Sequence, residues 1–444
     1  MPHLRFMFIA FAVLCLAGTV EAASEKEILK LSMAIEAALN HNPKVDRQYA
    51  ERAIADNRIE EQESRFYPEI KASAKAGTVR ANNATSRGIN QSGPTSTSGL
   101  GQGSVTITQL LFNGNETRKR IDAAQARRES ADTKIRDVRL KLALDTTLAY
   151  LDIVRSRDSI EKIDAHIKKL EKDISRIKTK VDSGAQSATA LQEARNILLK
   201  TKNQRHEIRK QLSTAQARYE QFTGEMPKPE RMARPVPPLD TIPSTQKAAL
   251  NYATNHHPRI KAATMQAKAR DHAVDAERAK IYPDLKGELS YTKRDLDRAL
   301  GGMLEDKRAI LRMDWNFATG GEQFARVDRA RKEYSKLLAR KRAIMRSVRS
   351  AIKTAFAERQ SARAQLENLR KQHDILKSHK QTLTTKFEGG QVSLLNLLKV
   401  EDKLFRLKMK LRNTQYKVLS TQFSILASTG RLYDALKISR VSSK

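Results

Sequence analysis

Histidines, cysteines and paired carboxylates are the residues whose spacing would first reveal an enzyme or a metal site. The chain of 444 residues has nine histidines, and none forms the helical pair four residues apart, with an acidic neighbour, that binds zinc. His256 and His257 stand directly before Pro258, where a helix would begin. No nucleophile motif, phosphate-binding loop or carboxylate pair stands out. The sequence therefore predicts no enzymatic activity, no metal and no cofactor.

The segment from Met1 to Ala22 has the composition of a secretory signal peptide. Arg5 precedes an apolar run from Phe6 to Ala17, and cleavage is expected after Ala22. An anchoring helix is the alternative, but the run is shorter than the ~20 apolar residues that a membrane-spanning helix needs. The chain's one cysteine, Cys15, lies in this segment. The mature chain is therefore expected to have no disulfide, no thiol nucleophile and no cysteine-bound metal.

The chain is strongly basic, with 83 lysines and arginines against 50 acidic residues and a formal net charge of +33. Removal of residues 1–22 leaves this charge unchanged, because Arg5 and Glu21 cancel. A basic chain first suggests nucleic acid as a partner, but an exported protein normally meets none. An anionic membrane surface or an acidic cargo fits better. Aromatic residues make up 5% and the mean hydropathy is −0.59, which favours long helices with narrow apolar seams over one packed core.

One segment of the sequence occurs twice, about half a chain length apart. Asn40 begins "NHNPKVDRQYA", and Asn255 begins the similar "NHHPRIKAATM". The same interval separates Tyr67 in "RFYPEIK" from Tyr282 in "KIYPDLK". Such repetition indicates a structure built from two similar units. Beyond the Tyr-Pro sites the interval between equivalent residues is shorter, because the first half has a longer connection, the Gly-, Ser-, Thr- and Asn-rich residues 81–104.

Alternating apolar and polar residues predict two short strands in each half, one before and one after the connection. In the second half Leu285, Leu289 and Tyr291 share one face, and Lys286 and Glu288 share the other. Each run is about ten residues long, which suits a tilted strand that crosses a bilayer, and a soluble half-buried hairpin is the alternative. The expected strands cover about residues 68–80, 103–112, 283–294 and 308–317.

Each half continues into a long helical hairpin. Apolar residues from Ile160 to Val181 repeat at alternating spacings of three and four, which is a coiled-coil heptad seam. The seam recurs from Leu366 to Phe387 with His373 and Lys380 as polar substitutions, and such residues more often fix helix register than bind a ligand. The first helix of each hairpin would be ~100 Å long at about 1.5 Å per residue. The expected hairpins cover about residues 115–223 and 320–428.

The resulting plan has two repeats, residues 23–224 and 244–430. Each consists of a short helix, a β-hairpin and a long helical hairpin. Between the repeats, residues 225–243 hold six of the twelve prolines and are expected to form an extended linker. Residues 431–444 are expected to form a short basic tail.

In this arrangement the sequence resembles the TolC family of outer-membrane efflux and secretion proteins, almost end to end. The markers are the duplicated Asn-x-x-Pro site at Asn40 and Asn255, and the duplicated Tyr-Pro before a strand. Glycine-containing turns at Gly184 and Gly390, each followed by an apolar heptad helix, complete the pattern. No single marker is specific, but their duplicated order at fixed spacing is.

The resemblance implies a mainly α-helical fold with a small β part, in which three chains form a 12-stranded β-barrel continuous with a periplasmic α-helical barrel. Four strands per chain cannot close a barrel alone, and open sheet edges do not lie in lipid. Residues 81–104 and 293–307 would be the extracellular tips. The implied function is the outer-membrane exit duct of a tripartite efflux pump or type I secretion system in a Gram-negative cell. The implied partners are two further copies of the chain, outer-membrane lipid, a periplasmic adaptor and an inner-membrane transporter, and no nucleic acid.

The resemblance places the periplasmic aperture at the two glycine turns. Many drug-exporting relatives carry acidic residues about one turn past the second turn and again three residues on, where this chain has Asn396 and Lys399. An acidic ring therefore cannot be carried over, and a ring of Lys399 would favour anions unless this side chain points away from the lumen. Tyr291 and Trp315 could be membrane-interface aromatics, or could pack between strands. The expected aperture residues are Gly184, Ser187, Gly389, Gly390, Gln391, Ser393, Asn396 and Lys399.

A periplasmic adaptor or structural coiled-coil protein of an export system is the second hypothesis. Adaptors also carry signal peptides and helical hairpins. They usually have one hairpin, inserted in lipoyl-like and β-barrel segments, whereas this chain is expected to have two equal hairpins. The repeat therefore favours the duct.

Overall fold

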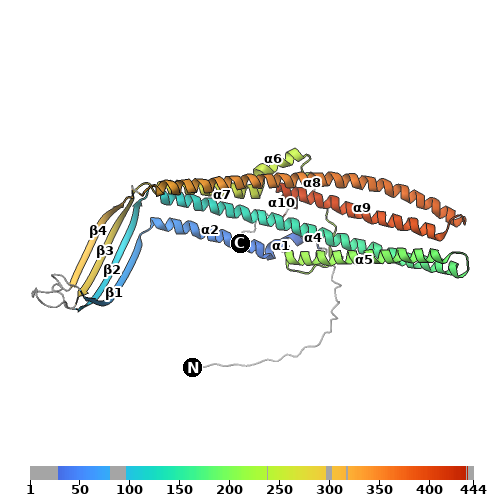
Figure 1. Cartoon of the computed structure of the whole chain (residues 1–444), viewed down its shortest axis with the longest axis horizontal. Coiled ribbons are helices and arrows are strands. Elements are labelled where there is room, and N and C mark those ends of the chain that lie inside the picture. The colour runs from blue at the N-terminus through green and yellow to red at the C-terminus, as the bar shows by residue number, and fades with distance from the viewer. Residues whose placement is uncertain are drawn as a thin grey trace, which may run out of the picture.

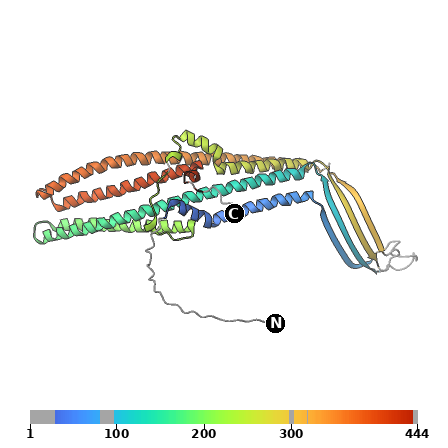
Figure 2. The same ribbon diagram turned by 180° about the vertical axis from the view of Figure 1, so that it is seen from behind.

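The computed structural model describes residues 29–80, 97–237, 239–296, 303–316, 319–436 and 438. Long helices run side by side for most of its length, and a four-stranded sheet extends from one end at an angle to them (Figure 1, and from behind in Figure 2). The tips of two helical hairpins form the other end. The expected signal peptide, residues 81–96 of the long connection, residues 297–302 and Phe317 lie outside the described residues.

Each half of the chain contributes two short helices, two strands and a pair of long helices. In the first half these are α1 (Leu31–His41), α2 (Pro43–Glu63), β1 (Glu69–Arg80), β2 (Thr97–Phe112), α4 (Glu116–Asp182) and α5 (Ala188–Thr223). In the second half they are α6 (Gln246–His256), α7 (Pro258–Ala279), β3 (Asp284–Leu296), β4 (Met303–Asp314), α8 (Glu322–Glu388) and α9 (Leu394–Thr429). A short helix, α10 (Leu432–Leu436), follows α9.

These bounds confirm the repeat that the sequence predicts. The interval from the start of α1 to the start of α6 equals that from α2 to α7. A second, shorter interval separates α4 from α8 and also α5 from α9. α4 and α8 both have 67 residues, and α5 and α9 both have 36. The prediction of a mainly α-helical fold with a small β part is likewise confirmed.

The repeated Asn-x-x-Pro site starts a helix in both halves, because proline is favoured at the first helical position. Pro43 and Pro258 are the first residues of α2 and α7. Asn42 and His257 cap these helices, and each side chain accepts a hydrogen bond from the backbone N–H two residues on, at 3.0 and 3.1 Å. Each cap satisfies a backbone donor that the helix cannot satisfy internally.

The four strands form one antiparallel sheet in the order β1-β2-β3-β4, and the β2–β3 pairing joins the two halves. β2 begins at Thr97, earlier than the expected residue 103, because its ladder with β1 extends to Arg80. β4 begins at Met303 and ends at Asp314, several residues before the expected bounds of 308 and 317 at each end. The strand pairs therefore extend farther from the helices than local alternation predicts.

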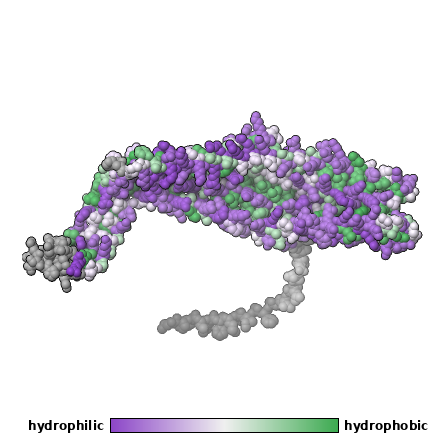
Figure 3. All heavy atoms as spheres, viewed as in Figure 1, coloured by the Kyte–Doolittle hydropathy of each residue, from purple (hydrophilic) through white to green (hydrophobic). Residues whose placement is uncertain are grey.

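The two faces of the sheet differ in polarity. Ile70, Ile107 and Leu289 lie directly opposite one another across three strands. One residue along, Lys71 lies opposite Thr106, which begins a polar row that continues through Ser290 to Arg308. Figure 3 shows hydrophobic residues among hydrophilic ones on the sheet, with further hydrophobic patches towards the hairpin tips. One face is thus suited to an apolar environment and the other to water.

α4 is the central helix of the molecule. Near the sheet it packs between α2 and α7, and near the tips it packs between α5 and α9, whereas α8 lies at one edge (Figure 1). The seam residues Ile163, Ile167 and Leu170 are buried, as the heptad pattern predicts. The largest apolar cluster lies at mid-length around Tyr150 and Phe423, where α1, α4, α5, α9 and α10 meet. In the described part of the chain, no helix is long and apolar enough to cross a membrane.

The described part of the expected basic tail packs against the helices. Leu432 and Ala435 of α10 are buried, and so is Ile438 beyond it. A spacing of three brings these apolar side chains to one face, which packs on the central cluster. The proline-rich linker is also anchored, because Leu29 forms a parallel bridge with Met232.

Candidate functional site

The two hairpin tips lie at the end of the molecule farthest from the sheet (Figure 1). Gly184 and Gly390 turn the chain, each with φ of 73°. The N–H of Gly184 donates to the carbonyl of Val181 at 2.9 Å, and that of Gly390 to the carbonyl of Phe387 at 3.0 Å. A Cβ at either glycine would meet no neighbouring atom, so the left-handed backbone alone requires glycine here.

The other expected aperture residues surround these turns. Gly389 has an ordinary φ of −79°, so its lack of a side chain is not required by the backbone. Ser187 and Ser393 are the capping residues at the start of α5 and α9, and the Ser393 hydroxyl accepts a hydrogen bond from the N–H of Asn396 at 3.3 Å. The N–H of Gln391 closes the end of α8 through a backbone bond of 2.8 Å. All of these residues shape the turns and the first turn of the returning helices.

An apolar cluster directly behind the turns joins the two hairpins. It combines side chains of the first hairpin with side chains of α9. Because the cluster is shared, the two tips of one chain are packed against each other. Its buried members are Leu170, Ile177, Ala190, Ala194, Leu394, Leu395 and Leu398.

Lys399 forms an ion pair with Glu193. These residues hold the same place in the two halves, since the interval between them equals that between Gly184 and Gly390. Both side chains are 44% exposed. The ammonium group of Lys399 thus has an acidic partner from its own chain, and a ring of Lys399 would carry a matching ring of Glu193.

Glu401 binds lysines from both long helices. Lys380 of α8 donates to its carboxylate at 2.8 Å, and Lys169 of α4 also binds it. The Glu401 side chain is only 13% exposed. Burial acts to raise the pKa of Glu401, but the two lysines outweigh this effect and the pKa lies below its ordinary value. The charged carboxylate therefore ties α9 to α4 and α8.

Asp402 provides the next link. It is nearly fully buried, and it accepts a hydrogen bond from Arg406 Nε at 2.8 Å. His166 of α4 stacks on Phe405 with ring centroids 3.9 Å apart, and its Nε2 lies 3.6 Å from an oxygen of Asp402. Burial acts to raise the pKa of Asp402, but His166 and Arg406 lower it below its ordinary value. This carboxylate and the stacked rings join α9 to α4 a second time.

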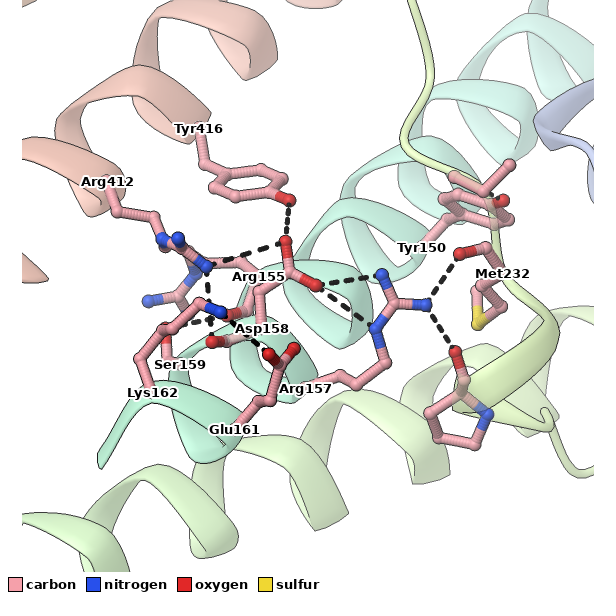
Figure 4. Close-up of polar contacts among 12 residues, drawn as sticks. Tyr150, Arg155, Arg157, Asp158, Ser159, Glu161, Lys162, Met232, Arg412 and Tyr416 are labelled. Carbon is pink, nitrogen blue, oxygen red and sulfur yellow. Dashed lines mark hydrogen bonds and ion pairs between the residues drawn. The ribbon is translucent and has the colours of Figure 1, made fainter. Parts of the chain in front are cut away.

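A further polar cluster fixes the middle of the molecule (Figure 4). The Arg157 guanidinium donates to the carbonyls of Pro229 and Met232, each at 2.7 Å, and to the carboxylate of Asp158. Asp158 also accepts a hydrogen bond from the Tyr416 hydroxyl of α9 at 2.8 Å. α4, α9 and the linker are therefore joined at one point.

The contacts described so far all hold helices together. Across the described ranges of the chain, no three histidine, cysteine, aspartate or glutamate side chains are placed to hold a metal ion. His373, at a seam position of α8, forms a hydrogen bond of 3.1 Å with Asp374. What these links can do is keep the helices of the tips in place or, when broken, release them.

One family profile covers most of the chain. The profile of the outer membrane efflux protein family matches residues 34–225 and 249–431, one segment in each half. The chain belongs to the outer membrane efflux protein family. The resemblance to TolC-type channels and the outer-membrane location that it implies are thereby confirmed, and the periplasmic adaptor hypothesis is not supported.

Individual proteins show the same relationship. The outer membrane efflux protein BepC of Brucella suis biovar 1 is 22% identical to this efflux protein over 427 residues, which cover 96% of this chain and 90% of BepC. The Campylobacter jejuni CmeC outer membrane channel superposes with a TM-score of 0.77 at 15% identity, covering 97% of this chain and 94% of CmeC. The open state of the Neisseria gonorrhoeae MtrE outer membrane channel has a TM-score of 0.73 at 15% identity, covering 90% and 89%. These two solved structures have the same fold as this chain.

Aromatic residues of this efflux protein gather where the sheet meets the helices. Trp315 is 52% exposed, and its Nε1 donates to the carbonyl of Ile281 at 3.1 Å. Tyr67 and Tyr282, from the duplicated Tyr-Pro sites, are 71% and 60% exposed at the same junction. Tyr291 lies farther along β3 and is not part of this group. The two expected interface aromatics are therefore at different heights, and the Tyr-Pro tyrosines are the ones that accompany Trp315.

The acidic residues that pair with lysines at the tips are not among the residues predicted from the sequence. Glu193 and Lys399 hold equivalent positions in the two halves but have opposite charges. This relationship is visible only after the two halves are aligned on their glycine turns. Glu401 and Asp402 are the two acidic residues of α9, in a helix that is otherwise basic. Adjacent acids in a basic helix are a signal that could have marked them.

Proposed function

We propose that three copies of this chain close into a tube that runs from the outer membrane into the periplasm. The observation that carries this proposal is that the single chain is open on both sides. Within the described chain, the sheet ends in two edge strands, β1 and β4, that pair on one side only. Such edges are templates for another chain. Three copies supply 12 strands, enough for a closed barrel with a water-filled lumen.

The helices are open in the same way. α5 and α8 lie at opposite edges of the tip-proximal helices, with α4 and α9 between them. Leu199 on α5 and Ile375 on α8 are 61% and 72% exposed. At about 1.5 Å per residue, Leu199 lies ~17 Å from the start of α5 and Ile375 lies ~20 Å from the end of α8. In a closed ring these two side chains would therefore meet across a subunit boundary and leave water.

The tube would serve as the passive exit duct of a tripartite efflux pump. Its tips would meet a periplasmic adaptor, and an inner-membrane transporter would supply the energy. Tyr67, Tyr282 and Trp315 would mark the periplasmic surface of the membrane, because tyrosine and tryptophan concentrate at membrane–water interfaces. The apolar face of the sheet would contact lipid and the polar face would line the lumen.

The duct is expected to favour anionic cargo. This expectation rests on the net charge of +33 and on basic residues of the polar sheet face such as Lys71 and Lys75. It does not rest on Lys399, whose charge is matched by Glu193. The ion pairs behind the turns would keep the tip end narrow until the adaptor separates them.

The test is a cross-link across the expected subunit boundary. Cys15 is the one cysteine of the chain and lies in the expected signal peptide, so a Leu199→Cys, Ile375→Cys double variant carries one engineered pair. Oxidation of the folded protein in outer-membrane fractions should give a covalent trimer on a denaturing gel. A Ser175→Cys, Ile375→Cys variant is the control, because Ser175 is exposed on the central helix α4 and should form no cross-link. Monomers alone from the first variant would contradict the closed ring.

A further inference from the structure

A buried arginine in the sheet-proximal half of α4 has no acidic partner in the described part of the chain. Arg139 is 6% exposed, and a guanidinium keeps its charge throughout the physiological pH range. Its Nη1 lies 3.4 Å from the Tyr49 hydroxyl, and its Nε has no hydrogen-bond partner among the described residues. A charge removed from water is normally paired, because its desolvation is costly.

A cavity of about 250 Å³ opens beside Arg139. Arg136 and Lys261 also line it, and Tyr433 forms part of its wall, with its hydroxyl beside the Arg139 guanidinium. The described lining contains no acidic residue. The cavity also borders the start of α7 at Pro258, and the N-terminus of this long helix adds partial positive charge. Three cationic side chains and a helix N-terminus thus surround one small space.

The repeat shows that the fold does not require an arginine at this position. The equivalent residue of α8, at the interval that separates Gly184 from Gly390, is Met345. Met345 packs with Val348 and Ile352 in an apolar cluster. Methionine is sufficient for helix packing at this position in the second half. The positive charge in the first half is therefore better explained by an interaction in the neighbouring cavity.

We propose that the cavity binds a small oxyanion, of the phosphate or carboxylate type. Its oxygens would accept hydrogen bonds from the guanidinium of Arg139 and the hydroxyl of Tyr433, while Lys261 and Arg136 balance its remaining charge. Guanidinium groups suit such ions because their parallel N–H donors match two oxygens at once. The cavity has room for the ion with several waters, each of which occupies about 30 Å³. The ion would join α4 to the start of α7 and to α10, at the junction where α9 ends.

The test is the binding of inorganic phosphate to the purified mature protein in detergent, at constant ionic strength with chloride as the balancing anion. Calorimetric titration and thermal unfolding are compared for the wild type and for Arg139→Met, which installs the residue of the second half. The wild type should bind phosphate at one site per chain and unfold at a higher temperature in its presence. Arg139→Met should weaken binding about tenfold or more and lose the phosphate-dependent shift. Arg195→Met, at an exposed position of α5, removes one positive charge elsewhere and should behave as the wild type.

Several results would overturn the proposal. Equal phosphate binding by the wild type and Arg139→Met would place the ion elsewhere. If chloride, phosphate, sulfate and acetate raised the unfolding temperature of the wild type equally, the cause would be screening of the net charge and not a specific site. A stronger effect of phosphate and sulfate than of acetate would identify the tetrahedral class. Lys261→Met and Tyr433→Phe test the same cavity should Arg139→Met fail to fold, and unchanged phosphate affinity in both would also contradict the site.

Discussion

α4 and α8 are equivalent helices of the repeat, but they differ in their surroundings. Both have 67 residues, yet α4 has buried residues in nearly every turn from Thr117 to Ile177, whereas α8 has only a few and none beyond Leu369. α4 is enclosed by α2, α5, α7 and α9 of its own chain, whereas α8 packs against α6, α7 and α9 and leaves its other side exposed. The difference supports the proposal that one chain is only part of a larger assembly. The exposed side of α8 is best explained as the place of a second copy.

The largest expected effect is on this exposed side of α8. Ile375→Asp would put a charge where an apolar side chain is buried only after the ring closes. Burying such a side chain contributes about 1.5–3 kcal/mol, and a trimer has three such interfaces, so the loss is about 5–9 kcal/mol per assembly. We expect the variant to be folded but no longer trimeric, as measured by light scattering after size-exclusion chromatography.

The matched control for this substitution is Ser175→Asp. Ser175 is exposed on α4, whose neighbours all belong to the same chain, so this charge should leave the mass at three chains. If the Ile375→Asp variant remained trimeric, or if both variants dissociated equally, α8 would not differ from α4 in contacting a second copy.

The next largest effect is expected in the middle of the molecule, where the two halves of the chain also differ. Arg157 of α4 holds the linker, whereas its equivalent in α8, Arg363, is exposed. Arg157→Met should destabilise the protein by about 2–3 kcal/mol, because hydrogen bonds to charged groups contribute about 1.5–3 kcal/mol. Arg363→Met should change the free energy of unfolding by less than about 0.5 kcal/mol. Denaturant unfolding of both variants provides the comparison, and equal values would mean that the cluster in Figure 4 does not stabilise the fold.

A pH effect should separate the two helix caps. Burial, and then Arg259, lower the pKa of His257 from 6.5 to about 4. The neutral ring accepts the capping hydrogen bond, so its stabilisation is complete above about pH 6.5 and is lost as the pH falls towards 4, by about 3 kcal/mol in all. His257→Asn, which copies Asn42 of the first half, should reduce the loss of stability between pH 7 and pH 5. The reverse change, Asn42→His, should increase that loss, and identical pH profiles for all three proteins would count against this account.

The smallest effect on stability is expected at the exposed pair of Lys399 and Glu193. Pairs of this kind contribute about 0–1 kcal/mol. Lys399→Asp should therefore lower the free energy of unfolding by less than about 1 kcal/mol, and the charge swap Lys399→Glu with Glu193→Lys should restore it. Thermal unfolding at low and high salt is the measurement, since screening should reduce the difference. A salt-independent loss would mean that Lys399 acts through packing instead.

Features that repeat along the chain can be predicted from the sequence alone. The heptad seam around Ile163 needs only a hydrophobic period of about 3.5, and Gly184 and Gly390 need only their own backbone conformation. The equal spacing of these features in both halves then predicts the architecture. For this reason the turns lie where they are expected, and the strand bounds differ from the expected ones by up to six residues.

Partners that depend on helix rotation or on distant segments cannot be predicted in this way. Glu401 binds lysines from two other helices, and the sequence around Glu401 does not indicate which lysines these are. The ladder that extends β2 to Thr97 depends on the length of β1 and not on alternation within residues 97–102. The docking of α10 likewise depends on contacts with two other helices, α4 and α9.

Single-channel conductance in planar bilayers tests whether the chain forms a duct that is held narrow at its tips. The wild type is compared with a Glu193→Lys, Glu401→Lys double variant, in which both tip links become repulsions between like charges. We expect small or rare openings from the wild type, frequent large openings from the variant, and a preference for anions in a salt gradient. Equal conductance of the two proteins would contradict the role of the tip links, and folded, inserted trimers that never conduct would contradict the duct itself.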